Sequence, residues 1–193
     1  MEFKKENYNG KEIFFAESKM NEAKSIALFH GYSFESSVWE KIGLVSNLNK
    51  VGYDVYAFDM PSFPKSRNKH IDVETFFSFF SSFAKKFGKI SILGASAGGH
   101  LAAKFSESNS NLVENLILVG AVGLEEINLP ESIKVIGIWG SEDNIYNPSL
   151  AQKEIARLGG KFYLIKGARH ACYLDKPDDF NKILLNELKY STN

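Results

Sequence analysis

Short apolar runs alternate with longer amphipathic segments along most of this chain, and that alternation leaves few folds open. The runs are rich in Ile, Val, Leu and Phe, which is typical of strands buried on both faces of a parallel sheet. The segments between them repeat their apolar residues at helical spacing. The expected strands are 25–29, 54–58, 89–93, 115–119, 134–139 and 161–165, and the expected helices are 37–50, 72–87, 97–108, 149–158 and 178–190.

A hairpin precedes this alternating region. Asn9-Gly10 stands between residues 2–7 and 11–16, and Asn-Gly is the strongest short signal for a two-residue hairpin turn. A hairpin followed by repeated strand–helix units predicts one α/β domain over residues 1–193, with a mostly parallel sheet, an N-terminal antiparallel hairpin and helices on both faces. Sheets of this kind place their chemistry at the carboxyl ends of the strands.

Composition excludes several classes of function. The 23 basic residues balance 23 acidic ones, so no overall field favours nucleic acid or an anionic membrane. A single cysteine, Cys172, excludes an internal disulfide and a cysteine-based zinc site. The first twenty residues are too charged for a signal peptide, and the apolar run 116–124 is too short to span a membrane. We therefore expect a cytoplasmic protein with neither a nucleic-acid nor a membrane partner.

The segment Gly94-Ala95-Ser96-Ala97-Gly98-Gly99 follows one expected strand and opens the next helix. This is the context of a Gly-x-Ser-x-Gly nucleophile elbow, in which a sharp turn exposes the serine hydroxyl and small neighbours let strand and helix approach. A Gly/Ser-rich turn without chemistry is the alternative. The flanking strand and helix favour Ser96 as a nucleophile.

A serine hydroxyl needs a base to take its proton. His170 follows the last expected strand, which is where the chain order serine, acid, histidine puts the base. The other three histidines fit less well: His30 is expected to shape its own loop, His70 lies in a charged stretch, and His100 lies on the helix after Ser96.

The acid that orients the base is expected in the loop after strand 134–139. That loop holds two carboxylates, Glu142 and Asp143, and spacing from Gly140 favours Asp143 while Glu142 stays open as the alternative. Its role would be to hold the imidazole tautomer and to stabilise the imidazolium. Asp175 is too near His170 in sequence to approach it from another strand.

An oxyanion intermediate needs two backbone donors, for which we predict the amides of Ala97 and Tyr32, the latter made accessible by Gly31. No metal or organic cofactor is required. Six side chains from the surrounding loops are candidates for the wall of an acyl pocket, although each also fits a packing role. They are Tyr32, Phe34, Trp39, Phe63, Leu124 and Tyr146.

The order of five motifs along the chain resembles that of the α/β-hydrolase superfamily, and the resemblance covers nearly the whole chain. The motifs are His30-Gly31 before a loop ending in Trp39, Asp59-Met60-Pro61-Ser62-Phe63-Pro64-Lys65-Ser66, the elbow, Gly140-Ser141-Glu142-Asp143 and Gly167-Ala168-Arg169-His170. More narrowly, residues 167–177 and the spacing from His30 to Trp39 resemble the small lid-less alpha/beta-hydrolase-domain 14, or factor B-like, group. The chain departs from the family at Ser62 and Pro64, where glycines are usual. Asp59 matches a structural family position.

The resemblance implies an esterase-like or deacylating enzyme. Residues 120–134 are too few for the helical cap that larger relatives insert there, so no cap domain is expected. We predict a serine hydrolase that cleaves a small acyl ester, thioester or amide through an acyl-enzyme. Two alternatives stay open: a binding or regulatory module of the same fold with little turnover, and a deacylase or acyltransferase acting on acylated protein lysine. The expected partner is a small acyl substrate, and a protein partner rests on the resemblance alone.

Overall fold

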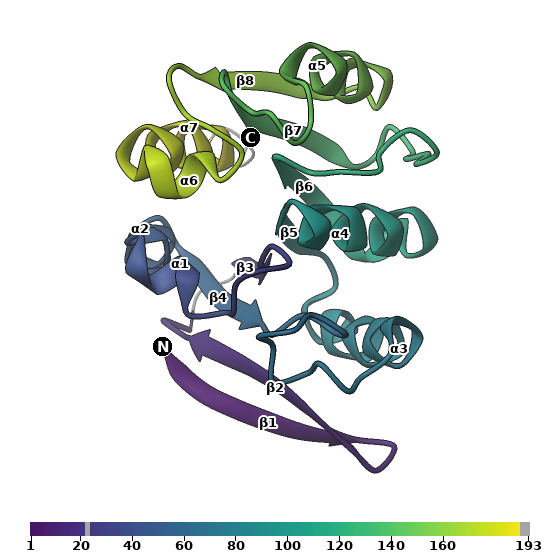
Figure 1. The fold of residues 1–193 in the computed structure, drawn as a ribbon. Helices are drawn as coiled ribbons and strands as arrows, with labels where there is room; N and C mark the ends of the chain where they lie inside the picture. The colour runs from purple at the N-terminus through teal and green to yellow at the C-terminus, as the bar shows by residue number, and fades with distance from the viewer. Residues whose placement is uncertain (22–23, 190–193) are drawn as a thin grey trace.

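In the computed structural model, which describes residues 1–21 and 24–189, one eight-stranded sheet runs through the centre of the molecule (Figure 1). The strand order is β1-β2-β4-β3-β5-β6-β7-β8. The β1–β2 and β2–β4 pairs are antiparallel, and all other pairs are parallel. The strands are β1 (Glu2–Tyr8), β2 (Lys11–Ser18), β3 (Lys24–Phe29), β4 (Tyr53–Phe58), β5 (Ile90–Ala95), β6 (Val113–Val119), β7 (Lys134–Gly140) and β8 (Lys161–Ile165).

The predicted fold class is confirmed. The hairpin turn falls at Asn9 and Gly10, which both have positive φ angles, 51° and 80°. This is the backbone that a two-residue hairpin of matching twist requires. Strands β3 to β7 are buried almost throughout, as their apolar runs predict.

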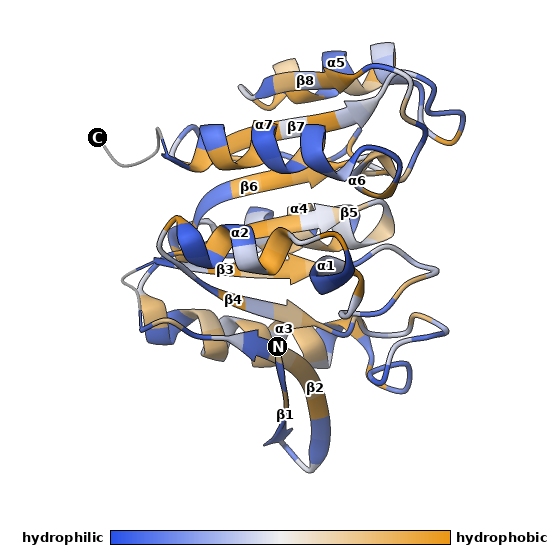
Figure 2. Cartoon of the chain, turned by 90° about the vertical axis from the view of Figure 1, so that its left-hand side faces the viewer, coloured by the Kyte–Doolittle hydropathy of each residue, from blue (hydrophilic) through white to orange (hydrophobic). Residues whose placement is uncertain are grey.

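Helices cover both faces of the sheet (Figure 1). One face carries α1, α2, α6 and α7, and the other carries α3, α4 and α5. Figure 2 shows the central strands as mostly apolar and the outward sides of the helices as mostly polar. Each face has its own hydrophobic core. The helices are α1 (Val38–Lys41), α2 (Leu44–Lys50), α3 (Val73–Ala84), α4 (Ala97–Ser108), α5 (Pro148–Arg157), α6 (Cys172–Asp175) and α7 (Pro177–Lys189).

Two helix predictions need correction, and one short helix is additional. The helix expected at 37–50 is two helices, because Gly43 adopts a φ of 70° and ends α1 before α2 begins. The segment expected at 72–87 ends as a 3₁₀ turn at Lys85–Phe87. Helix α6 was not predicted, because four residues are too few to establish a helical period. The last residue of the expected helix 178–190 lies outside the described residues.

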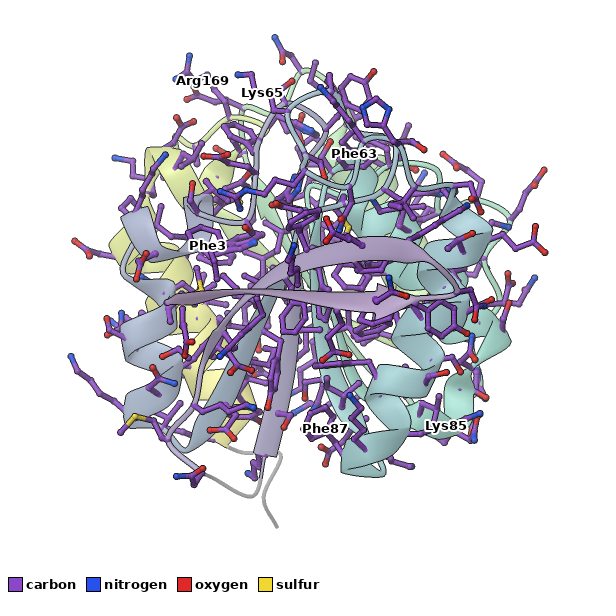
Figure 3. All side chains as sticks on the ribbon, turned by 90° about the horizontal axis from the view of Figure 1, so that it is seen from below. Phe3, Phe63, Lys65, Lys85, Phe87 and Arg169 are labelled. Atoms are coloured by element: carbon purple, nitrogen blue, oxygen red, sulfur yellow. The ribbon has the colours of Figure 1, made fainter. Side chains whose placement is uncertain are left out.

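The loops that follow the parallel strands gather at one end of the sheet. Figure 3 shows Phe63, Lys65 and Arg169, from the loops after β4 and β8, at that end, and Lys85 and Phe87 at the opposite end. Residues 120–133, between β6 and β7, form a loop without a helix, so no cap covers this end. Over 1–21 and 24–189, no helix has the length and apolar character needed to cross a membrane.

Candidate active site

Ser96 sits at the turn between β5 and α4 with a strained backbone, φ 52° and ψ −122°. A residue with a side chain rarely adopts this region, and such strain persists only where the surrounding structure enforces it. The Ser96 amide donates to the Val119 carbonyl of the neighbouring strand at 2.9 Å, which fixes the turn against β6. The side chain is thereby lifted to the end of the sheet.

The small residues around Ser96 are required by close backbone approach. A Cβ atom at Gly98 would lie 2.3 Å from the His30 carbonyl oxygen, and one at Gly94 would lie 2.6 Å from the Gly98 carbonyl oxygen. Both distances are shorter than real contacts allow, and in each case the obstacle is backbone, which does not move aside cheaply. The glycines therefore let α4 cross closely over β5 and the end of β3.

Three predicted site residues from distant parts of the chain meet here. His170 Nε2 lies 2.9 Å from Ser96 Oγ, and His170 Nδ1 lies 2.8 Å from Asp143 Oδ2. A carboxylate only accepts, so Nδ1 carries the ring proton and Nε2 is left to accept the Ser96 hydroxyl. Glu142, the alternative acid, is exposed, and it is Asp143 that contacts the imidazole.

The Asp143 carboxylate is held in place by its own loop. Its side chain is fully buried, and Oδ1 accepts hydrogen bonds from the amides of Ile145 at 2.8 Å and Tyr146 at 3.1 Å. These two bonds occupy one oxygen and leave Oδ2 directed to His170. A fixed carboxylate of this kind orients the imidazole ring.

The loop that carries His170 is closed on itself by an ion pair. The Asp175 carboxylate accepts from the Arg169 amide at 2.8 Å and from its guanidinium at 3.1 Å. Hydrogen bonding to Arg169 holds the pKa of Asp175 below its usual value. Asp175 thus contacts the residue preceding His170 rather than His170 itself.

The predicted oxyanion donors are the backbone amides of Ala97 and Tyr32, two residues close to Ser96. Ala97 is the first residue of α4, and Gly31, which precedes Tyr32, lies so close to Ser96 that a Cβ there would be 3.5 Å from the Ser96 Cβ. Within the described part of the chain, neither the Ala97 nor the Tyr32 amide has a hydrogen-bond partner. Both amides are therefore available as donors beside the Ser96 side chain.

A pocket of about 100 Å³ opens beside Ser96 and His170. Two of the six predicted wall residues, Tyr32 and Phe34, line it. Sequence reasoning missed Val119, the last residue of β6, and Tyr173, which follows the loop that carries His170. The available signal was their position at the carboxyl end of a strand and next to the base. The lining residues are Gly31, Tyr32, Ser33, Phe34, Ser96, Val119, His170, Ala171 and Tyr173.

The other four predicted wall residues do not line this pocket. Trp39 and Leu124 are fully buried in the two cores on opposite faces of the sheet. Phe63 lies behind Tyr32, with ring centres 5.3 Å apart. Tyr146 donates its hydroxyl to Glu125 at 2.8 Å. Aromatic side chains in loops next to a sheet are as useful for packing as for binding, and sequence alone does not separate the two roles.

The loop after β4 keeps a glycine-like backbone although it carries Ser62. Ser62 has a φ of 60°, the left-handed region that glycine adopts readily. Its hydroxyl donates to the Ile71 carbonyl at 3.1 Å, and its amide donates to the Asn68 carbonyl at 3.3 Å. These bonds support the left-handed turn at Ser62.

His30 and Asp59 form a buried support beneath the loop after β3. His30 Nδ1 lies 2.9 Å from the Gly31 carbonyl, and Nε2 accepts from the Met60 amide at 2.9 Å. Asp59 accepts from the Ser36 amide at 2.9 Å and from Arg67 at 3.2 Å. These contacts hold the loop that carries Gly31 and Tyr32.

Burial lowers the pKa of His30 below its usual 6.5. The unfolded chain then takes up a proton below about pH 6.5 that the folded protein excludes, so acidification favours unfolding. We expect this residue to add about 1.4 kcal/mol per pH unit to the fall in stability below that pH. The free energy of unfolding is measured in urea between pH 7 and pH 5. His30→Gln should reduce the slope of this free energy against pH, whereas His70→Gln, at an exposed position, should not. Equal slopes for His30→Gln and wild type would contradict the assignment.

Comparisons with known proteins agree with this fold. The alpha/beta hydrolase fold family model matches residues 24–136. The chain is 25% identical to the putative protein-lysine deacylase ABHD14B of Rattus norvegicus, over 93% of this chain and 92% of that protein. It is 28% identical to protein ABHD14A of Danio rerio over 84% of this chain, and it spans 63% of the length of that relative.

Solved structures show the same architecture. A predicted CIB-like hydrolase from Thermoplasma acidophilum superposes with a TM-score of 0.83 at 28% identity, covering 97% of this chain and 98% of that one. MGS-MChE2, an α/β hydrolase enzyme from a lagoon-sediment metagenome, superposes with a TM-score of 0.80 at 23% identity, covering 98% and 99%, which is a likeness of fold. With a family match over more than half of its residues and this sheet order, the chain belongs to the α/β-hydrolase fold family.

Proposed function

We propose that this protein is a serine hydrolase that cleaves small acyl esters through a covalent acyl-enzyme. The observation that carries the proposal is the continuous hydrogen-bond chain from Ser96 Oγ through His170 to Asp143, with links of 2.9 and 2.8 Å, at the wall of a pocket. Nucleophile, base and orienting acid within hydrogen-bond distance are what acyl transfer from an ester requires.

The steps follow from the positions of these groups. Ser96 Oγ attacks the acyl carbonyl while its proton passes to His170 Nε2, and Asp143 stabilises the imidazolium. The amides of Ala97 and Tyr32 donate to the oxyanion. His170 returns the proton to the leaving alcohol as the C–O bond breaks. Water, deprotonated by the same nitrogen, then attacks the acyl-enzyme and releases the acid and free Ser96.

The size of the pocket supports a short acyl group. Pockets for drug-sized ligands hold roughly 300 to 1,000 Å³, and a cavity of roughly 150 Å³ accommodates benzene. The volume of about 100 Å³ beside Ser96 therefore suits an acyl chain of a few carbons. The loop over residues 120–133 adds no helix above the site, so the leaving group extends into solvent.

A second candidate is removal of an acyl group from protein lysine. The name of the ABHD14B relatives, putative protein-lysine deacylase, favours it. The uncapped entrance also supports it, because an acylated lysine has to reach the site from a large protein. The amide nitrogen is a poorer leaving group than an alcohol, so protonation by His170 carries more of the barrier in this reaction.

One panel separates these functions. Wild-type protein is assayed with the p-nitrophenyl esters of acetate, butyrate and octanoate and with an acetyl-lysine peptide. We expect turnover of the acetyl and butyryl esters at least tenfold above that of the octanoyl ester, since the pocket excludes added methylenes. Release of acetate from the peptide, leaving an unmodified lysine side chain, at a comparable kcat/KM would favour the second candidate. A folded wild-type protein that turns over no substrate and does not react with a fluorophosphonate would contradict both and favour a binding module.

A further inference from the structure

We propose that Tyr173 sets the limit on acyl chain length by forming the inner wall of the pocket. The inference rests on the proposed function and identifies the side chain that gives the site its selectivity. Tyr173 lies on α6, three residues after His170, so the same segment positions the base and closes the pocket.

Tyr173 combines a large side chain with burial, whereas the other large aromatic residues of the lining are not buried. The pocket is otherwise bordered by small residues, by Ser96 and His170 themselves, by Val119, and by Tyr32 and Phe34, which are not buried. Tyr173 is 3% exposed and borders the pocket from the side of the core. An acyl chain that grows inward from Ser96 therefore meets this ring.

The space behind Tyr173 is apolar and filled by rings. Its ring centre lies 5.1 Å from that of Trp39 and 6.0 Å from that of Phe180. The ring of Phe34, 6.3 Å away, lines the pocket itself. Trp39 and Phe180 are fully buried. Shortening the Tyr173 side chain would therefore extend the pocket into the space that the ring vacates, beside Trp39 and Phe180, which suits a longer alkyl chain.

The position of this wall is fixed by the local fold. The Leu174 amide donates to the Ala171 carbonyl at 2.8 Å, and the Lys176 amide donates to the Cys172 carbonyl at 3.0 Å. The Arg169–Asp175 pair closes the same segment. Because the backbone is held on both sides, replacing the ring removes the wall without releasing His170.

The test is Tyr173→Ala, assayed with the acetyl, butyryl and octanoyl esters. We expect the ratio of kcat/KM for octanoyl over acetyl to rise at least tenfold, because each methylene accepted by an apolar pocket contributes about tenfold or more. Tyr173→Phe keeps the ring and should keep the wild-type ratio. Phe180→Leu loosens packing on the far side of Tyr173 and should lower the melting temperature while leaving the ratio unchanged.

Labelling rates with ethyl and octyl fluorophosphonates give a readout that does not require turnover. A Tyr173→Ala protein that labels and hydrolyses with the wild-type chain-length profile would overturn the inference while leaving the serine hydrolase intact. An equal change in Phe180→Leu would also overturn it, because the effect would then be general loosening. If Tyr173→Ala does not fold, Tyr173→Leu serves the same test. A wild type that neither labels nor hydrolyses any ester would overturn the proposed function and this inference together.

Discussion

Replacing Ser96 with alanine is expected to lower kcat/KM for the acetyl ester by about 10⁴- to 10⁶-fold. The substitution removes the hydroxyl oxygen that contacts His170 Nε2 and that would attack the carbonyl. The backbone donors stay in place, so some residual rate above that in water is expected. Stopped assays with purified protein at high enzyme concentration measure the loss.

Ser106→Ala is the matched control for this substitution. Ser106 lies on the same helix, is fully buried, and donates its hydroxyl to the Ala102 carbonyl at 2.8 Å. Its removal deletes a buried hydroxyl from α4 without touching His170, so kcat/KM should stay within a few-fold of wild type. Comparable rates for Ser96→Ala and wild type, with both proteins folded by circular dichroism, would remove Ser96 from the chemistry.

Asp143→Asn is expected to lower kcat by about 10⁴-fold, because an amide favours the wrong imidazole tautomer and does not stabilise the imidazolium. The fold should survive, since the asparagine oxygen still accepts from the Ile145 and Tyr146 amides. Pre-steady-state kinetics with the acetyl ester measure the loss in the acylation step directly.

Glu142→Gln is the comparison that decides between the two carboxylates. Glu142 is exposed and adjacent in sequence, so removing its charge changes the local field by a similar amount without breaking a contact to His170. We expect less than a tenfold change in kcat. A larger loss for Glu142→Gln than for Asp143→Asn would reassign the orienting acid.

The sheet was predictable because each of its strands and its hairpin turn has a signal in the local sequence. Strands β3 to β7 are buried on both faces, so each stands out as a compact apolar run, and Asn9-Gly10 marks the hairpin directly. The nucleophile elbow was predictable for a related reason. A serine at a φ of 52° needs small neighbours, and the sequence supplies them at Gly94 and Gly98.

The pocket was less predictable because its walls depend on contacts between distant segments. Trp39 lies on the short helix α1 and Tyr173 on the short helix α6. Trp39 is buried in the core, whereas Tyr173 lines the pocket. No spacing rule separates them, because the loop between each residue and the preceding strand has no regular period from which the direction of a side chain could be predicted. The two candidate acids show the same limit of prediction from sequence. Glu142 and Asp143 are adjacent, and only the structure shows that Asp143 is the carboxylate buried against the imidazole.

Because β8 lies at the end of the sheet, the integrity of the site depends on the local stability of this edge strand. β8 pairs with β7 alone, and the segment bearing His170 follows it. Edge strands unfold locally at a lower free energy than central strands. Local unfolding of β8 would therefore move the His170 imidazole away from Ser96 while the central strands stay protected from hydrogen exchange. Inactivation on warming should then precede loss of the bulk structure, and the temperature range of activity would be governed by the stability of this edge of the sheet.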